Sequence, residues 1–100
     1  MANKSSSPST VLHPGKVLKK QFLDKISISQ NALADEIGVA RNRVHAIIRG
    51  QRSVTVDTDL RLCKFFKVSE GYFLNLQNLF DRQKVKRQLQ TALKNIKPYR

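Results

Sequence analysis

The sequence predicts an all-α fold made of five helices and an additional basic C-terminal helix. Two observations lead to this prediction. Apolar residues recur every three or four positions through most of the chain, as they do on one face of an amphipathic helix. Ser, Thr and Gly stand where these stretches begin or end, which is typical of residues that cap helices. The alternation of apolar and polar residues that marks a strand is found nowhere.

The first predicted helix follows a polar, serine-rich stretch at residues 1–11, which we interpret as a disordered arm. Pro14 suits the first helical position because proline has no amide hydrogen to lose there. The helix is expected to reach about Asp24. Its apolar stripe consists of Val17, Leu18, Phe22 and Leu23.

Two short helices joined by a tight turn are predicted between Ser29 and Gly50. Ser29 is a suitable N-cap for the first of them, and Gly38 ends it where a left-handed residue is needed. The next helix spans about Ala40 to Arg49. Such a pair has the layout of a helix-turn-helix, which places its second helix in a DNA major groove.

Two more helices complete the predicted domain, which we expect to cover residues 12–81. Thr55 is expected to cap a fourth helix and Ser69 a fifth. The apolar stripe of the fourth helix consists of Leu60, Cys63 and either Phe65 or Phe66. The stripe of the fifth consists of Tyr72, Phe73, Leu76, Leu79 and Phe80.

The last part of the chain, residues 82–100, holds seven basic residues and no acidic one. Val85, Leu89 and Ile96 recur there at helical spacing, so we predict a basic amphipathic helix rather than a random tail. It is expected either to pack on the fifth helix or to add contacts to DNA.

The charge of the chain points to a polyanionic partner. Nineteen Lys and Arg against seven Asp and Glu give a formal net charge of +12 in 100 residues, which favours nucleic acid first and an anionic membrane surface second. No apolar run approaches the ~20 residues of a membrane span, and no secretory signal is found. The single Cys63 excludes an internal disulfide and is expected to be an inert core thiol, so a cytoplasmic protein is predicted.

The exposed face of the third helix carries the predicted DNA-reading residues. At ~100° per residue, a helix with Val44 and Ile47 turned inward points Asn42 outward. Arg can form two hydrogen bonds with guanine and Asn two with adenine. The outward and flanking positions hold Asn42, Arg43, His45, Ala46 and Arg49, and Arg41 in the first turn can reach past the end of the helix. A basic face on a short helix is more often merely solvated, but the caps, turn glycine and apolar triad at these spacings favour a helix-turn-helix. We expect this element to bind DNA.

Phosphate contacts are expected at the start of the second predicted helix, next to that face. The start of the second helix offers free amides and short polar side chains from Ser29, Gln30 and Asn31. Phosphate contacts of this kind position a protein on the duplex without reading its sequence.

Several stretches together resemble a known family of regulators. They are His13-Pro14-Gly15, SQNALADEIGV followed by Asn42-Arg43, TVDTDLRL and YFLNLQ. They resemble the lambda-repressor-like, Xre-type helix-turn-helix domains, and among these the HigA-type (VapI-like) addiction-module antitoxins, over about residues 12–81. The resemblance implies a five-helix domain that forms a homodimer and represses its own promoter at a palindromic operator. It also implies binding to, and blocking of, a HigB-type mRNA-cleaving toxin.

The resemblance also assigns roles by position. Gln30 would clamp a phosphate, and the residues at the start of the third helix would face base edges. Backbone contacts after the recognition helix would come from Arg49, Gln51 and Arg52. The dimer contact would come from Phe73, Leu76 and Phe80. Ala40 departs from the family pattern as a weak cap, and the basic extension lies outside the match.

Other functions are weighed against this one. No catalytic triad, nucleotide loop or metal-ligand set can be assembled, so neither an enzyme nor a cofactor is expected. His13 is interpreted as a cap or surface residue. An RNA-stacking role for the aromatic residues of the fifth helix is less favoured than packing. A solitary Xre-type regulator without a toxin, or a general RNA- or chromatin-type binder, remain the alternatives.

Overall fold

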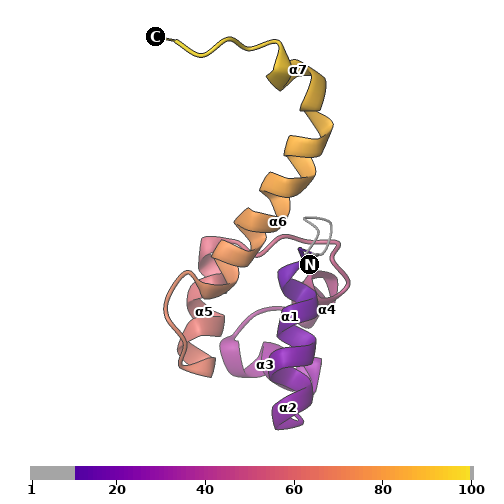
Figure 1. Cartoon of the computed structure of the whole chain (residues 1–100). Coiled ribbons are helices and arrows are strands. Elements are labelled where there is room, and N and C mark those ends of the chain that lie inside the picture. The colour runs from indigo at the N-terminus through magenta and orange to yellow at the C-terminus, as the bar shows by residue number, and fades with distance from the viewer. Residues whose placement is uncertain (1–10, 100) are drawn as a thin grey trace, which may run out of the picture.

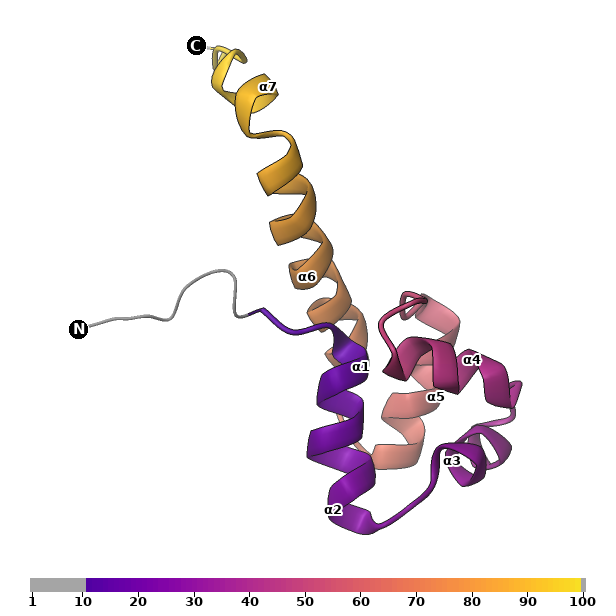
Figure 2. The ribbon, with the colours of Figure 1, turned by 90° about the vertical axis from the view of Figure 1, so that its right-hand side faces the viewer.

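The computed structural model describes residues 11–99, and every regular element in that range is a helix. The predicted all-α fold is therefore confirmed there, whereas residues 1–10 of the expected N-terminal arm lie outside the described range. Figure 1 shows a cluster of short helices from which one longer helix extends toward the C-terminus, and Figure 2 shows the same arrangement from the side.

The first helical run is built from three consecutive elements: α1 (Pro14–Val17), the π-helical segment η2 (Leu18–Leu23) and α2 (Asp24–Ile26). It begins at Pro14, as predicted. The wider turns of η2 pair residues five apart, as in the bond from the Asp24 amide to the Lys19 carbonyl. Leu18 and Leu23, also five apart, are both buried in the core at 1% and 3% exposure.

His13 caps this run from the core side. Its Nδ1 accepts a hydrogen bond from the Gly15 amide at 2.9 Å, which confirms a cap, although the side chain is buried rather than at the surface. Its ring packs edge-on against Phe80 with a centroid distance of 5.1 Å. Burial lowers the pKa of His13, and the charge of Asp81 partly opposes this shift.

The two short helices of the predicted helix-turn-helix are α3 (Gln30–Ile37) and α4 (Arg41–Ile48). The Ser29 hydroxyl accepts from the Ala32 amide at 3.0 Å, so Ser29 is the N-cap of α3. Gly38 ends α3 in the left-handed conformation, with φ of 73°, as expected from its place in the sequence. Ala40 precedes α4 without a side-chain capping bond.

Helix α5 (Val56–Phe66) begins after Thr55, whose hydroxyl accepts from the Thr58 amide. The predicted cap at Ser69 is wrong, because α6 (Tyr72–Gln88) begins three residues later, after Gly71. Its first turn is capped instead by the buried carboxylate of Asp59 on α5. That carboxylate accepts from the amides of Gly71, Phe73 and Leu74 at 2.7, 2.9 and 2.9 Å.

The core lies between the first helical run and helices α3 to α6. Phe73 is fully buried and packs with a group of aromatic rings that also contains Phe22, Phe66 and Tyr72. Leu60, expected on the inner stripe of α5, is 43% exposed, because Leu62 and Cys63 take the inward positions. Core packing of Phe73 thus accounts for part of the aromatic pattern of the fifth predicted helix.

Helix α6 runs through residue 81 without a break and projects away from the core, followed by α7 (Gln90–Lys94) (Figure 1). Buried Gln77 ties α6 to the domain by accepting from the Val54 amide at 2.9 Å, and it also donates to Asp81 of the same helix at 3.0 Å. Beyond residue 81 the apolar side chains of this C-terminal arm are exposed. They are Val85, Leu89, Leu93 and Ile96. The arm therefore continues α6 instead of folding back onto it.

We expect Gly15→Ala to destabilise the fold. A Cβ at Gly15 would lie 1.9 Å from the Ile47 carbonyl oxygen and 3.0 Å from the Ile48 Cα, so α1 and α4 would have to move apart. This clash should cost about 3 kcal/mol of unfolding free energy, although Ala in a helix normally gains about 0.5–1 kcal/mol over Gly. Urea denaturation measures it, with exposed Lys16→Ala as control. Equal stabilities of the two variants would contradict the close contact.

We expect Asp59→Asn to lower the free energy of unfolding more than Asp57→Asn does. An amide at position 59 presents an N–H₂ group to a backbone donor of α6, which should cost about 3 kcal/mol of unfolding free energy. Asp57 is exposed, so its ion pairs should contribute about 1 kcal/mol or less. The same urea titration compares them. If both variants lose equal stability, Asp59 does not hold the start of α6.

Candidate nucleic-acid interface

The outward face of α4 is arranged as the angular placement predicts. Val44 and Ile47 are buried at 2% and 1% exposure, whereas Asn42 and Arg49 are exposed on the other side of the helix. Ala46, between these two along the chain, is half-buried. An exposed amide and guanidinium on one short helix can form paired hydrogen bonds with the edges of adenine and guanine.

Arg41, at the start of α4, is paired with α3. Its Nε and Nη2 donate to the two carboxylate oxygens of Asp35 at 3.1 and 2.7 Å. This hydrogen bonding lowers the pKa of Asp35 and raises that of Arg41. The pair is exposed, so its contribution to stability is small, but it fixes the direction of the Arg41 guanidinium.

His45 joins the two helices of the motif. Its Nδ1 lies 2.7 Å from Gln30 Oε1, and its Nε2 lies 2.8 Å from Asn31 Oδ1. Three of the predicted contact residues are therefore brought together on one side of the α3–α4 pair.

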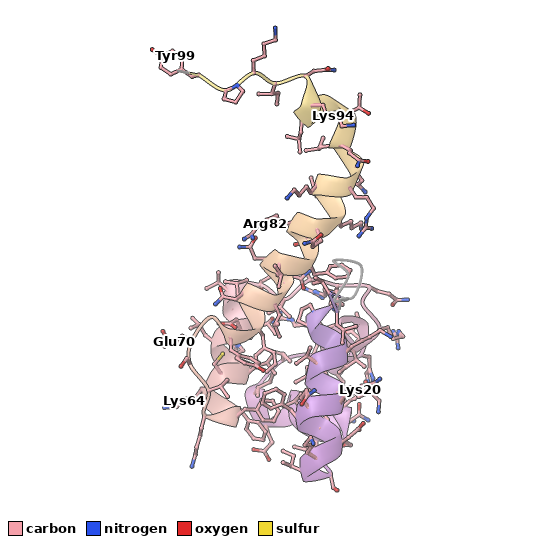
Figure 3. All side chains as sticks on the ribbon, viewed as in Figure 1. Lys20, Lys64, Glu70, Arg82, Lys94 and Tyr99 are labelled. Carbon is pink, nitrogen blue, oxygen red and sulfur yellow. The ribbon has the colours of Figure 1, made fainter. Side chains whose placement is uncertain are left out.

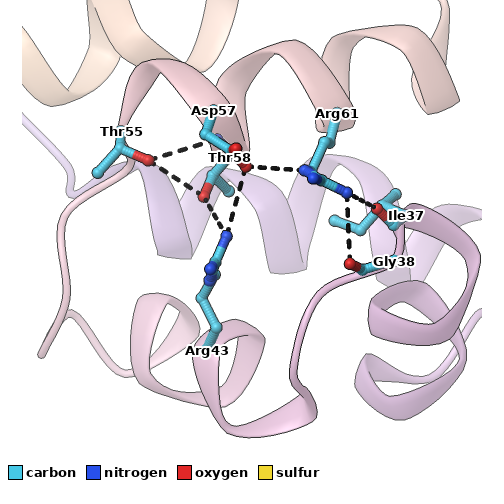
Figure 4. Close-up of polar contacts among 7 residues, drawn as sticks. All are labelled: Ile37, Gly38, Arg43, Thr55, Asp57, Thr58 and Arg61. Atoms are coloured by element: carbon cyan, nitrogen blue, oxygen red, sulfur yellow. Dashed lines mark hydrogen bonds and ion pairs between the residues drawn. The ribbon is translucent and has the colours of Figure 1, made fainter.

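Arg43 points in a direction that the sequence did not predict. Its Nη1 lies 3.5 Å from both Asp57 Oδ1 and Thr58 Oγ1 on α5, and its side chain is 29% exposed (Figure 4). The side chain is thus turned toward the domain, and a contact with DNA would require it to leave Asp57 and Thr58.

Arg61 of α5 is a positioning residue that the sequence did not single out. Its Nη1 donates to the carbonyls of Ile37 and Gly38 at 2.8 and 3.3 Å, and its Nε donates to Asp57 at 2.7 Å (Figure 4). These carbonyls lie at the end of α3, where a helix leaves its acceptors unsatisfied. The spacing of Asp57 and Arg61 could have indicated their ion pair, but not the reach of Arg61 to the turn.

The remaining predicted contact residues lie at the two ends of the motif. Ser29 uses its hydroxyl as the cap of α3. Arg49 donates from Nε to Gln51 Oε1 at 3.2 Å, and Gln51 and Arg52 are exposed in the loop after α4. Figure 3 shows further basic side chains away from the motif, among them Arg82 and Lys94 on the C-terminal arm and Lys20 and Lys64 on the domain.

Metal binding and thiol chemistry are not favoured within residues 11–99. In that range no three His, Cys, Asp or Glu side chains gather closely enough to hold a metal ion. Cys63 is buried, and burial raises the pKa of its thiol, which disfavours the reactive thiolate. None of the helices described combines the length and the apolar character needed to cross a membrane.

Comparison with known proteins agrees with this geometry. The family described as Helix-turn-helix matches residues 19–73. Virulence-associated protein I of Dichelobacter nodosus is 36% identical over 80 residues, which are 80% of this chain and 72% of that protein. The chain belongs to the helix-turn-helix family. Within it the chain is similar to HigA-type antitoxins, and this family consists of DNA-binding regulators rather than enzymes.

Solved helix-turn-helix structures extend the similarity to nearly the whole chain. The Pseudomonas aeruginosa antitoxin HigA with the higBA promoter has a TM-score of 0.85 at 30% identity, covering 90% of this chain and 99% of that one. An addiction-module antidote protein of the HigA family from Coxiella burnetii has a TM-score of 0.83 at 37% identity, covering 89% and 98%. The resemblance noted from the sequence motifs is confirmed.

Proposed function

We propose that this chain is an antitoxin that represses its own promoter in the cytoplasm by binding operator DNA with α3 and α4. The observation that carries the proposal is the outward face of α4, where exposed Asn42, Arg41 and Arg49 are not accompanied by any acidic residue of that helix. The structures similar to this chain include an antitoxin solved with promoter DNA, which supports the same mode of binding.

Binding would follow the geometry of other helix-turn-helix dimers. Two copies of α4 would enter successive major grooves ~34 Å apart on one side of the duplex. The start of α3, with Gln30, would meet the DNA backbone, and Arg49 and Arg52 would meet it after the recognition helix. Phosphate contacts would supply much of the affinity and make it strongly dependent on salt.

We propose a dimer surface that differs from the residues that the resemblance assigned to the dimer contact. Phe73 is fully buried within one chain, so its side chain is not available to a second copy. Leu76 packs partly against the core, and Phe80 is half-buried against His13. We propose that the homodimer contact uses the more exposed apolar residues of α6, of which Leu79 is 40% and Val85 is 45% exposed.

We expect Asn42→Ala to relax the sequence preference and Arg52→Ala to weaken all DNA alike. The first variant loses an amide able to pair with adenine, so the preference for operator over random DNA should fall by about tenfold or more. The second loses a backbone contact and should reduce the salt slope of binding by about one. Gel-shift titrations at several salt concentrations measure both. If Asn42→Ala keeps its full preference, the assigned reading face is wrong.

We also propose that the chain binds and blocks a small mRNA-cleaving toxin, as its similarity to HigA-type antitoxins implies. Co-expression with the product of the neighbouring gene should give a complex that survives affinity purification and high salt. The expected complex should also suppress growth arrest by that product. If the neighbouring gene encodes no such toxin, the chain is a solitary regulator, and only the DNA-binding part of the proposal stands.

A further inference from the structure

The ring of His45 lies between two side-chain amides, and both of its nitrogen atoms are engaged. The acceptors are carbonyl oxygens, with Oε1 of Gln30 at 2.7 Å from Nδ1 and Oδ1 of Asn31 at 2.8 Å from Nε2. Gln30 and Asn31 are the first two residues of α3, whereas His45 lies in the second half of α4. The ring therefore bridges the two helices that carry the proposed DNA interface.

A planar side-chain amide carries its oxygen and its N–H₂ group on the same carbon, and the two point in different directions. When the oxygen is directed at the His45 ring, the N–H₂ group is directed elsewhere, and Asn31 is exposed. We propose that His45 is a positioning residue for DNA binding, which holds the Gln30 and Asn31 amides so that their N–H₂ groups are presented to the DNA backbone. The inference rests on the proposed function, since it concerns how α3 and α4 engage DNA.

The number of protons on the ring decides whether both contacts can form. A neutral imidazole has one N–H and one lone pair, so it can donate to only one carbonyl oxygen, whereas the imidazolium donates to both. When His45 is neutral, one of the two amides has to turn its N–H₂ group to the ring and its oxygen outward. An outward oxygen repels the phosphate oxygens of DNA, because both are acceptors. Binding of DNA should therefore favour the imidazolium and take up a proton.

The charged groups around His45 do not offer another site that would take up this proton. On α4, Arg41 and Arg49 lie one turn before and after it, and Arg43 is paired with Asp57 of α5. On α3, Asp35 is paired with Arg41, and Glu36 follows Asp35. Helix α1, which also packs on α4, contributes Lys16 as its charged side chain. Asp, Glu, Lys and Arg ordinarily keep their charge between about pH 5 and pH 8, where histidine changes its own.

His13 is the second histidine near α4 and needs a control of its own. It caps α1, and its Cγ would lie 3.9 Å from a Cβ added to Gly50 at the end of α4. His13→Asn keeps an acceptor for the cap but removes the titrating ring. A pH profile that is the same in wild type and His13→Asn assigns the proton to His45.

The test measures binding of the full chain to a duplex that carries the promoter of its own gene, by fluorescence anisotropy at constant ionic strength. Between about pH 8 and pH 5.5 we expect the wild-type Kd to fall, with an uptake of up to about one proton per subunit. His45→Ala should bind about tenfold more weakly at the acidic end and show a flat profile. His45→Gln, which has a similar size and keeps a donor and an acceptor, should recover part of the affinity but not the slope.

The double variant Gln30→Ala, Asn31→Ala separates positioning from direct contact, because it retains His45. A flat pH profile in this variant supports the proposal, whereas a retained slope means that His45 itself contacts DNA and overturns it. Thermal melting of each free variant shows whether its fold is retained. A wild type that does not bind the promoter contradicts the proposed function. A wild type that binds with the same affinity and profile as His45→Ala contradicts only this inference.

Discussion

The buried carboxylate of Asp59 is the contact on which the second half of the structure depends. It is 1% exposed, and it is held by three backbone amides at the start of α6 and by the Cys63 thiol at 3.4 Å. A buried charge is tolerated only when hydrogen bonds replace its water, and free amides at a helix N-terminus do so with favourable dipoles. By joining α5 to α6 in this way, Asp59 places Phe73 in the core and sets the direction in which the C-terminal arm leaves the domain.

The recognition helix is positioned by its neighbours more than by its own sequence. An eight-residue helix is only marginally stable alone, and α4 lacks a side-chain cap. Three contacts fix it instead: the close approach of Gly15 to Ile47, the bonds of Arg61 to the turn, and the bridge of His45 to α3. A face held by three contacts would lose little conformational freedom on binding DNA in the proposed way, and this would favour both affinity and specificity.

Local signals in the sequence predict the elements but not the long-range contacts between them. Caps such as Ser29, Gly38 and Thr55 act within three residues, so both ends of α3 and the start of α5 follow from the sequence. Ser69 misled the prediction because the cap of α6 comes from Asp59, which lies 12 to 15 residues before the amides that it caps, and sequence spacing carries no sign of it. The angular placement gave the buried and exposed sides of α4 correctly. It could not tell that the long side chain of Arg43 ends at α5.

The proposed DNA contacts divide affinity and specificity between different parts of the molecule. Five of the seven carboxylates contact groups of the chain itself, namely Asp24, Asp35, Asp57, Asp59 and Asp81. The residues after Asp81 include no acid, so the arm contributes positive charge that is not compensated nearby. Such charge attracts DNA over about one Debye length, ~8 Å at physiological salt, whatever its sequence. We propose that discrimination between sequences comes mainly from contacts of the short face around Asn42 with the base edges.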